Sequence, residues 1–188
     1  MRDEIVDALK MPMNRVTGDG GFLQHFQAAE EFRLTVRPAP IRTTVLMGEI
    51  CGTFLHREAM AGKVLSVAPS AEDRVFSSDK NILFHSLSAL VQNALEATTL
   101  NGRVTVDCTS VHHGVQFSIH NDGCVPADHR VRIFQKNFST KAEDRGQGTY
   151  ACKLLVEKYL DGRTWFESDH ERGTVFFISL PERIVGRL

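Results

Sequence analysis

Two stretches of alternating residues joined by a short turn are the feature that most constrains the fold of this chain. RVTVDCTSV and VQFSIHN alternate apolar and polar side chains, and HHG lies between them. A period of two is typical of strands with one buried face, and the polar break predicts a hairpin. RTWFES and TVFFISL, on either side of DHERG, predict a second hairpin near the C-terminus. The sheet is therefore expected to be antiparallel or mixed.

Helical patterns separate these strands. Apolar residues recur at helical spacing over 41–61, and a long helix is predicted from Lys80 to about Thr98, with N-cap chemistry in Ser77, Ser78 and Asp79. KVLSVAP and DRVFSS are short extended runs, 122–148 is a polar loop, and TYACKLLVEKYL is a helix. Helices alternating with strand pairs predict an α+β fold, a two-layer α/β sandwich with helices on one face of a mixed, mostly antiparallel sheet.

The chain divides at VRPAPI, which is predicted to be an extended linker because of its two prolines. Residues 1–36, with predicted helices over 2–11 and 21–33, are either a native helical segment or the remainder of a dimerisation hairpin. Residues 37–188 form the main domain. A homodimer through the N-terminal segment is one possibility.

Composition excludes several functions. The chain has 22 basic and 23 acidic residues, so no nucleic-acid surface is expected. No apolar run is long enough to span a bilayer. Its four cysteines form no CxxC pair, which indicates reduced thiols and a cytoplasmic location. The histidines show no HExxH spacing, so a zinc site is not expected.

Asn93, in the middle of LVQNALEAT, is the first candidate site residue. Asparagine is a mediocre helix former, and a partly buried carboxamide needs partners. It is either an asparagine at the rim of the core or an oxygen ligand for a hard cation such as magnesium.

A second candidate follows the strand VQFSIHN. NDG alone would indicate a hairpin turn, but Pro126 argues against a following strand, so the turn opens a loop. Asp122 could accept hydrogen bonds from an exocyclic amine, and Gly123 could let a flat ring approach the backbone. Further on, FSTK places Lys141 where it is either a surface lysine or a phosphate ligand.

DRGQGTYACK sets Gly146 and Gly148 just before a predicted helix. The stretch lacks the GxxxxGK[ST] spacing of a P-loop, and it lacks the third glycine and parallel βαβ unit of a dinucleotide site. What remains is a glycine-rich loop at a helix N-terminus, where free N–H groups favour anions.

Together and in this order, these motifs resemble the ATP-binding domain of sensor histidine kinases, within the superfamily of gyrase and mismatch-repair ATPases. LVQNALEAT resembles the N box, HNDGCVP the G1 box, IFQKNFSTK the F box, and GQGTYACKLLVEKYLDG the GTY variant of the G2 box. GTVFFISLP resembles the closing strand. The resemblance covers about residues 40–182 and implies three helices over one face of a mixed sheet.

The resemblance also implies roles for individual residues. Asn93 would ligate Mg²⁺, Asp122 would bind the adenine amino group beside Gly123, and Thr174 would support that aspartate. Lys141 would reach the phosphates, and Gly146 and Gly148 would present N–H groups to them. The remaining residues that the resemblance places in the ATP site are Ser139, Thr140, Gln147 and Thr149. ATP and Mg²⁺ are the implied ligands, and the implied partners are a histidine-bearing dimerisation domain and a response regulator.

The chain departs from the family pattern at two places. Ala89 occupies a position that is commonly Asn, Glu or His, so no catalytic residue is assigned. No histidine has the setting of a phosphoacceptor, and His25 is the best of those present. A histidine kinase domain is therefore the first hypothesis, and a degenerate nucleotide-binding module with little kinase activity is the second. An ATPase that clamps a partner ranks last.

Overall fold

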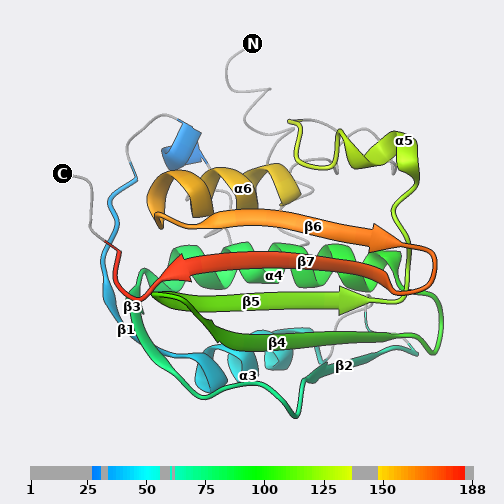
Figure 1. The fold of residues 1–188 in the computed structure, drawn as a ribbon, viewed down its shortest axis with the longest axis horizontal. Helices are drawn as coiled ribbons and strands as arrows, with labels where there is room; N and C mark the ends of the chain where they lie inside the picture. The colour runs from blue at the N-terminus through cyan, green and yellow to red at the C-terminus, as the bar shows by residue number, and fades with distance from the viewer. Residues whose placement is uncertain (1–26, 31–33, 56–59, 61, 137–147, 185–188) are drawn as a thin grey trace.

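A five-stranded sheet with three helices over one face forms the body of the protein (Figure 1). The computed structural model describes residues 27–30, 34–55, 60, 62–136 and 148–184. The strands of the sheet are β2 (Val64–Val67), β4 (Arg103–Val111), β5 (Gly114–Asn121), β6 (Arg163–Asp169) and β7 (Gly173–Pro181). The covering helices are α3 (Thr43–Phe54), α4 (Lys80–Ala97) and α6 (Gly148–Tyr159). This arrangement confirms the predicted α+β sandwich.

The strand order of this sheet is β2-β4-β5-β7-β6. β2 runs parallel to β4, whereas the pairs β4–β5, β5–β7 and β7–β6 are antiparallel. The β4–β5 and β6–β7 hairpins are those that the alternating pattern predicts. Because β5 ends where β7 begins, the turn that follows β5 and the turn between β6 and β7 lie at the same end of the sheet.

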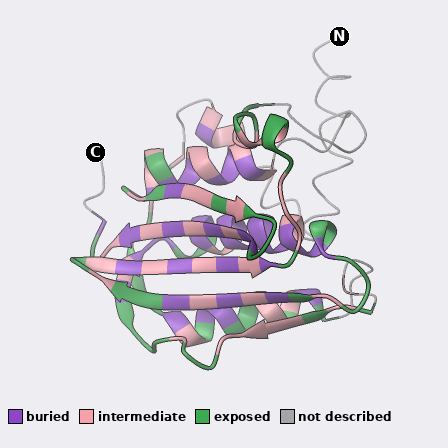
Figure 2. Cartoon of the chain, turned by 45° about the vertical axis from the view of Figure 1, so that its right-hand side comes forward, coloured by how far each residue is buried: buried purple, intermediate pink, exposed green. Residues whose placement is uncertain are grey.

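The register of β5 and β7 decides which side chains meet beneath the helices. Buried and partly exposed residues alternate along both strands, as Figure 2 shows. The buried cross-strand pairs are Val115 with Leu180, Phe117 with Ile178, Ile119 with Phe176, and Asn121 with Thr174. The row is apolar until its last pair, which is polar and lies at the edge of the core.

Asp79 begins α4. One of its carboxylate oxygens accepts hydrogen bonds from the backbone N–H groups of Asn81 and Ile82, at 3.0 and 3.1 Å. The other oxygen accepts a bond from the N–H of Arg37 at 2.8 Å. These contacts confirm the predicted N-cap and connect the start of α4 to the extended stretch that leads into β1.

Three local predictions need correction. The linker through VRPAPI contains a strand, β1 (Ala39–Arg42), which pairs with β3 (Val75–Ser78), and the following helix begins at Thr43 rather than at residue 41. Pro40 is tolerated because β1 is an edge strand. The polar loop after β5 contains a short helix, α5 (Ala127–Arg130).

Of the predicted N-terminal helices, only the helical residues 27–30 lie within the described part of the chain.

Candidate nucleotide-binding site

The turn after β5 packs directly against α4, the helix that carries Asn93. A β-carbon at Gly123 would lie 2.7 Å from the carbonyl oxygen of Ala97, which is closer than real β-carbons approach. Glycine is therefore required at this position for the approach of the turn to the helix. Since Ala97 lies about one helical turn after Asn93, the half-buried Asn93 side chain and this turn are brought to the same region.

A hydrogen-bonded group of polar side chains fixes the turn. The amide nitrogen Nδ2 of Asn121 donates to the carbonyl oxygen of Gly123 at 3.3 Å, and the hydroxyl of Thr174 donates to the same oxygen at 2.7 Å. The hydroxyl of Ser168 lies 2.8 Å from that of Thr174 and accepts a bond from the N–H of Val125. Ser168 of β6 thereby holds the turn after β5 in place.

Asn121 has one side-chain atom that makes no hydrogen bond. The residue is 1% exposed, and its oxygen Oδ1 has no hydrogen-bond partner among the residues that the structure describes. A buried acceptor without a partner costs free energy, and a ligand donor would relieve that cost. Because the Nδ2 group of Asn121 already donates to Gly123, the atom of this side chain that is left for a ligand is Oδ1, a hydrogen-bond acceptor.

Asp122, the predicted adenine ligand, lies on the exposed side of the turn. Its side chain is exposed, and its carboxylate accepts a 3.3 Å hydrogen bond from the N–H of Arg103. Thr174 contacts the carbonyl of Gly123 and the hydroxyl of Ser168, not the carboxylate of Asp122. The structure thus brings Thr174 together with Asn121 on the helix-facing side of the sheet.

Sequence reasoning missed Asn121, although a signal was present. The alternation in VQFSIHN puts Val115, Phe117 and Ile119 on the buried face, and the next residue of that series is Asn121. Asn121 was considered only as part of the NDG turn, and not as the last buried position of the strand VQFSIHN.

Helix α6 supplies the other side of the candidate site. Gly148 and Thr149 are its first residues, and the hydroxyl of Thr149 donates to the carbonyl of Ile133. Ala89 lies beneath this helix end: it is 3% exposed, and a β-carbon at Gly148 would lie 3.9 Å from the methyl group of Ala89. A small residue at position 89 therefore allows α4 and α6 to pack closely.

Phe134, in the described stretch after α5, belongs to an aromatic cluster. The centre of the Phe134 ring lies 5.9 Å from that of Phe166 and 6.2 Å from that of Phe176. The Nζ atom of Lys153 lies 5.1 Å from the centre of the Phe134 ring. The other predicted residues, Ser139, Thr140, Lys141, Gly146, Gln147 and His25, lie outside the described residues.

All four cysteines are free thiols. Burial raises the pKa of Cys108 to about 12 and raises that of Cys152 as well. Cys124 is half-buried in the turn after Asn121, with Sγ 3.6 Å from Nη2 of Arg130.

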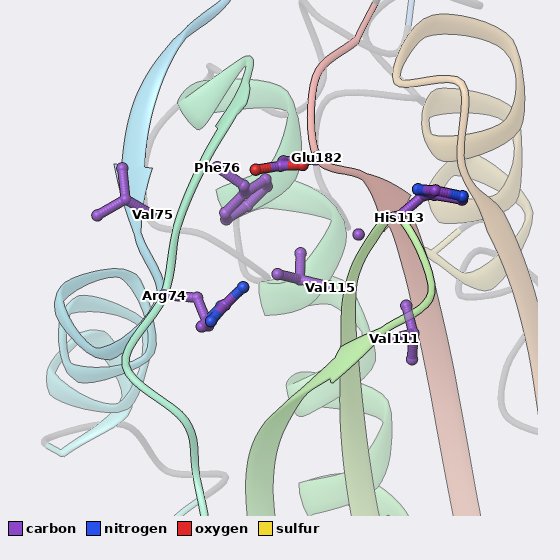
Figure 3. Close-up of a pocket in the computed structure, with 8 residues that line it drawn as sticks. Arg74, Val75, Phe76, Val111, His113, Val115 and Glu182 are labelled. Carbon is purple, nitrogen blue, oxygen red and sulfur yellow. The ribbon is translucent and has the colours of Figure 1, made fainter.

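A separate hollow of about 150 Å³ lies at the far end of β5 (Figure 3). It is lined by Arg74 just before β3, by Phe76 of β3, by Val115 near the start of β5 and by Glu182 after β7. Because β5 runs from this hollow to Asn121 at its other end, the hollow is distinct from the candidate nucleotide site.

Comparisons with known proteins agree with this geometry. The sequence profile of the histidine kinase-, DNA gyrase B-, and HSP90-like ATPase family matches residues 78–184, more than half of the chain. The heme sensor protein HssS of Staphylococcus aureus (strain Newman) is 27% identical over 142 residues, which are 73% of this chain and 31% of HssS. The chain thus spans less than a third of the length of this relative.

Solved structures give the same result. The catalytic domain of the histidine kinase ThkA, in a nucleotide-free form, superposes with a TM-score of 0.67 at 26% identity, covering 78% of this chain and 97% of that domain. A complex of ThkA with the response regulator protein TrrA matches with a TM-score of 0.66 at 24% identity, over 93% of this chain and 51% of ThkA. The latter likeness concerns the fold alone.

The chain therefore belongs to the histidine kinase-, DNA gyrase B-, and HSP90-like ATPase family. Within it, this is an ATP-binding domain of the kind found in two-component sensor histidine kinases. No helix among the described residues is long and apolar enough to cross a membrane.

Proposed function

We propose that the chain binds ATP with Mg²⁺ between α4, the turn after β5 and the first turn of α6, and that it passes the γ-phosphate to a histidine. The observation that carries the proposal is the inward pair of Asn121 and Thr174, fixed against the last turn of the helix that bears Asn93. This pair closes one end of the site, and the N-terminus of α6 lies at the other.

The adenine end is the better-defined part of this proposal. The acceptor Oδ1 of Asn121 suits the exocyclic amine of adenine, which is a donor. Thr174 keeps the turn in place through Gly123, so the purine would pack beside that glycine. Asp122, exposed and bonded to Arg103, is the alternative acceptor that the family resemblance suggests.

The phosphate end rests on α6 and on Asn93. The N–H groups of Gly148 and Thr149, in the first turn of α6, suit phosphate oxygens, and Asn93 would hold Mg²⁺ through its carbonyl oxygen. No cluster of three or more His, Cys, Asp or Glu side chains among the described residues could hold a metal ion, so phosphate and water would supply the other ligands. From the resemblance, Ser139, Thr140, Lys141, Gly146 and Gln147 complete this end.

Little covalent chemistry is required of the domain. Bound Mg²⁺ would neutralise charge on the phosphate oxygens, and the protein would orient the nucleotide. The bond from the γ-phosphorus to the bridging oxygen breaks, a bond to an imidazole nitrogen forms, and ADP leaves. The acceptor histidine would lie on a dimerisation domain, and a response regulator would receive the phosphate next, as the complex of ThkA with TrrA suggests.

A fluorescent-nucleotide titration tests the site. We expect wild type to bind an ATP analogue in the presence of Mg²⁺, and Asn93→Ala to abolish or severely weaken this binding while the circular dichroism spectrum is unchanged. Gln92→Ala, which removes the neighbouring carboxamide on α4, is the matched control and should bind as wild type does. Unchanged affinity in Asn93→Ala would contradict the assignment.

Phosphotransfer needs its own test. The chain is incubated with γ-labelled ATP and a histidine-bearing dimerisation domain. Acid-labile phosphate on that domain is the expected product. Nucleotide binding without any such product would favour a degenerate, nucleotide-sensing module instead.

The burial of Ala89 supports this second candidate function. A methyl group cannot hold a metal ion or orient a nucleophile, and here it is packed beneath Gly148. If the module is degenerate, Ala89→Asn should raise ATP turnover from near zero, provided that thermal unfolding shows the variant to be folded. Rapid turnover in wild type would exclude this alternative.

We also propose that residues 37–188 form the ATP-binding domain, with residues 1–36 as an N-terminal segment. A cytoplasmic location is supported by the four free thiols.

A further inference from the structure

Residues 27–30 of the N-terminal segment pack onto the ATP-binding domain beside α6 (Figure 1). Residues 27–30 are helical, and the side chain of Ala29 is completely buried as part of the hydrophobic core. The carbonyl oxygen of Ala29 accepts a 2.7 Å hydrogen bond from the hydroxyl of Tyr159, near the end of α6. The segment is therefore docked by an apolar side chain and a directed polar contact.

A second contact joins this segment to the chain stretch that precedes the glycine-rich loop. Glu30 Oε1 lies 2.6 Å from Lys136 Nζ, although the residues are 106 positions apart. Both side chains are partly exposed, at 29% and 49%. An ion pair this exposed contributes about 0.2–1 kcal/mol at most, so holding the fold together is not its main effect.

Lys136 belongs to a stretch that touches both ends of the proposed ATP site. Ile133 accepts the hydrogen bond from Thr149 in the first turn of α6, and Phe134 packs in the aromatic cluster next to it. On the other side, Arg130 Nε donates to the carbonyl of Val125, in the turn that follows Asn121. A change in the position of Lys136 would therefore shift residues at both the adenine end and the phosphate end of the proposed site.

We propose that docking of residues 27–30 is coupled to nucleotide binding through the Glu30–Lys136 pair. The docked segment holds the stretch around Lys136 in the arrangement that binds nucleotide, so losing the contact weakens nucleotide affinity. By reciprocity, bound nucleotide strengthens the docking. This coupling rests on the proposed function, and it gives whatever lies N-terminal of residue 27 a way to act on the ATP site.

The experiment is a charge exchange in the full chain, measured with a fluorescent ATP analogue and Mg²⁺. Glu30→Lys and Lys136→Glu should each raise the dissociation constant about two- to fivefold, the range expected for an exposed pair. The double variant should return close to wild type because the pair re-forms with its charges reversed. Tyr159→Phe, which loses only the hydroxyl that contacts Ala29, should change the affinity in the same direction as Glu30→Lys.

A matched exchange controls for general charge effects. Glu49 and Lys80 form a comparable exposed pair at 2.8 Å between α3 and α4, and Glu49→Lys should leave the dissociation constant unchanged. Glu30→Lys without effect, or a double variant no better than the singles, would overturn the coupling. Wild type that binds no nucleotide would overturn the proposed function itself, so the two failures are distinguishable.

Discussion

Asn121 and Asp122 are neighbours in sequence, but their side chains serve different surroundings. Asn121 is buried beside Thr174 with an acceptor that has no partner, and Asp122 is exposed and bonded to Arg103. A ligand that donates to Oδ1 of Asn121 therefore supplies a hydrogen bond that no described protein group makes.

The first prediction compares these two residues. Asn121→Ala should raise the dissociation constant for ATP about five- to 150-fold, the cost of about 1–3 kcal/mol for losing a hydrogen bond to a buried group. Asp122→Ala should change it by much less. Isothermal titration calorimetry of both variants gives the comparison, and a larger loss in Asp122→Ala would return the adenine contact to that residue.

The same pair illustrates how far the sequence can be interpreted. Asn93, Gly123 and Thr174 were predicted as site residues because each occupies a position in a recognisable motif, and the structure brings their elements together. Choosing between Asn121 and Asp122 requires knowledge of which strand face turns inward. That depends on the pairing of Asn121 with Thr174, between residues far apart in the chain.

Helix α3 has a composition that its packing does not explain. It contains Gly48 and Gly52, and a β-carbon at either would meet nothing within 4 Å. Neither backbone has the positive φ that would favour glycine. The two glycines therefore lower helix stability without a steric reason within the described structure.

The second prediction follows from that observation. Gly48→Ala and Gly52→Ala should each stabilise the protein by about 0.5–1 kcal/mol, the difference in helix propensity between the two residues. Gly162→Ala is the contrasting control. Its β-carbon would lie 2.6 Å from the carbonyl oxygen of Ser179, so this substitution should destabilise the protein. Chemical denaturation measures all three, and loss of stability at position 48 or 52 would contradict the open environment.

Elements differ in how well local sequence specifies them. The β4–β5 and β6–β7 hairpins and α4 were predicted because their periodicity is strong and their ends carry turn or cap residues. β1 was not, since its short sequence APIR becomes a strand only through pairing with β3. After α6 the left-handed conformation is adopted by Asp161, with φ 52°, although the next residue, Gly162, is of the type that usually adopts it.

At the scale of the whole molecule, the sheet separates two regions of polar residues. The end of β5 carries Asn121 and the turn packed on α4, whereas its beginning borders the hollow with Arg74 and Glu182. The apolar pairs between β5 and β7 join these ends through a continuous core. The pairing register of β5 and β7 that aligns these apolar residues therefore also places the polar pair of Asn121 and Thr174 at the edge of the core.

Acidic side chains distributed over the surface set how this fold responds to pH. The hydrogen bond from Arg42, together with one from Thr44, lowers the pKa of Asp73. The backbone N–H groups of Arg172 and Glu171 lower the pKa of Asp169, which begins the turn between β6 and β7. A hydrogen bond from Ser110 lowers the pKa of Glu72 in the same way.

The last prediction follows from the sign of these shifts. A carboxyl group with a lower pKa in the folded state binds fewer protons there than in the unfolded chain, so it favours folding above its ordinary pKa of about 4. That contribution is lost as the pH falls through the folded value. Stability measured by urea unfolding should therefore change little between pH 7 and 5 from these groups, and it should decrease steeply below about pH 4.

Asp169→Asn keeps an oxygen acceptor for the two N–H groups but cannot titrate, so its decrease in stability should be shallower. Glu171→Gln removes a charge from the same turn without removing an acceptor of those bonds, and it should follow wild type. Equal slopes for Asp169→Asn and wild type would show that the turn contributes nothing to the acid sensitivity of the fold.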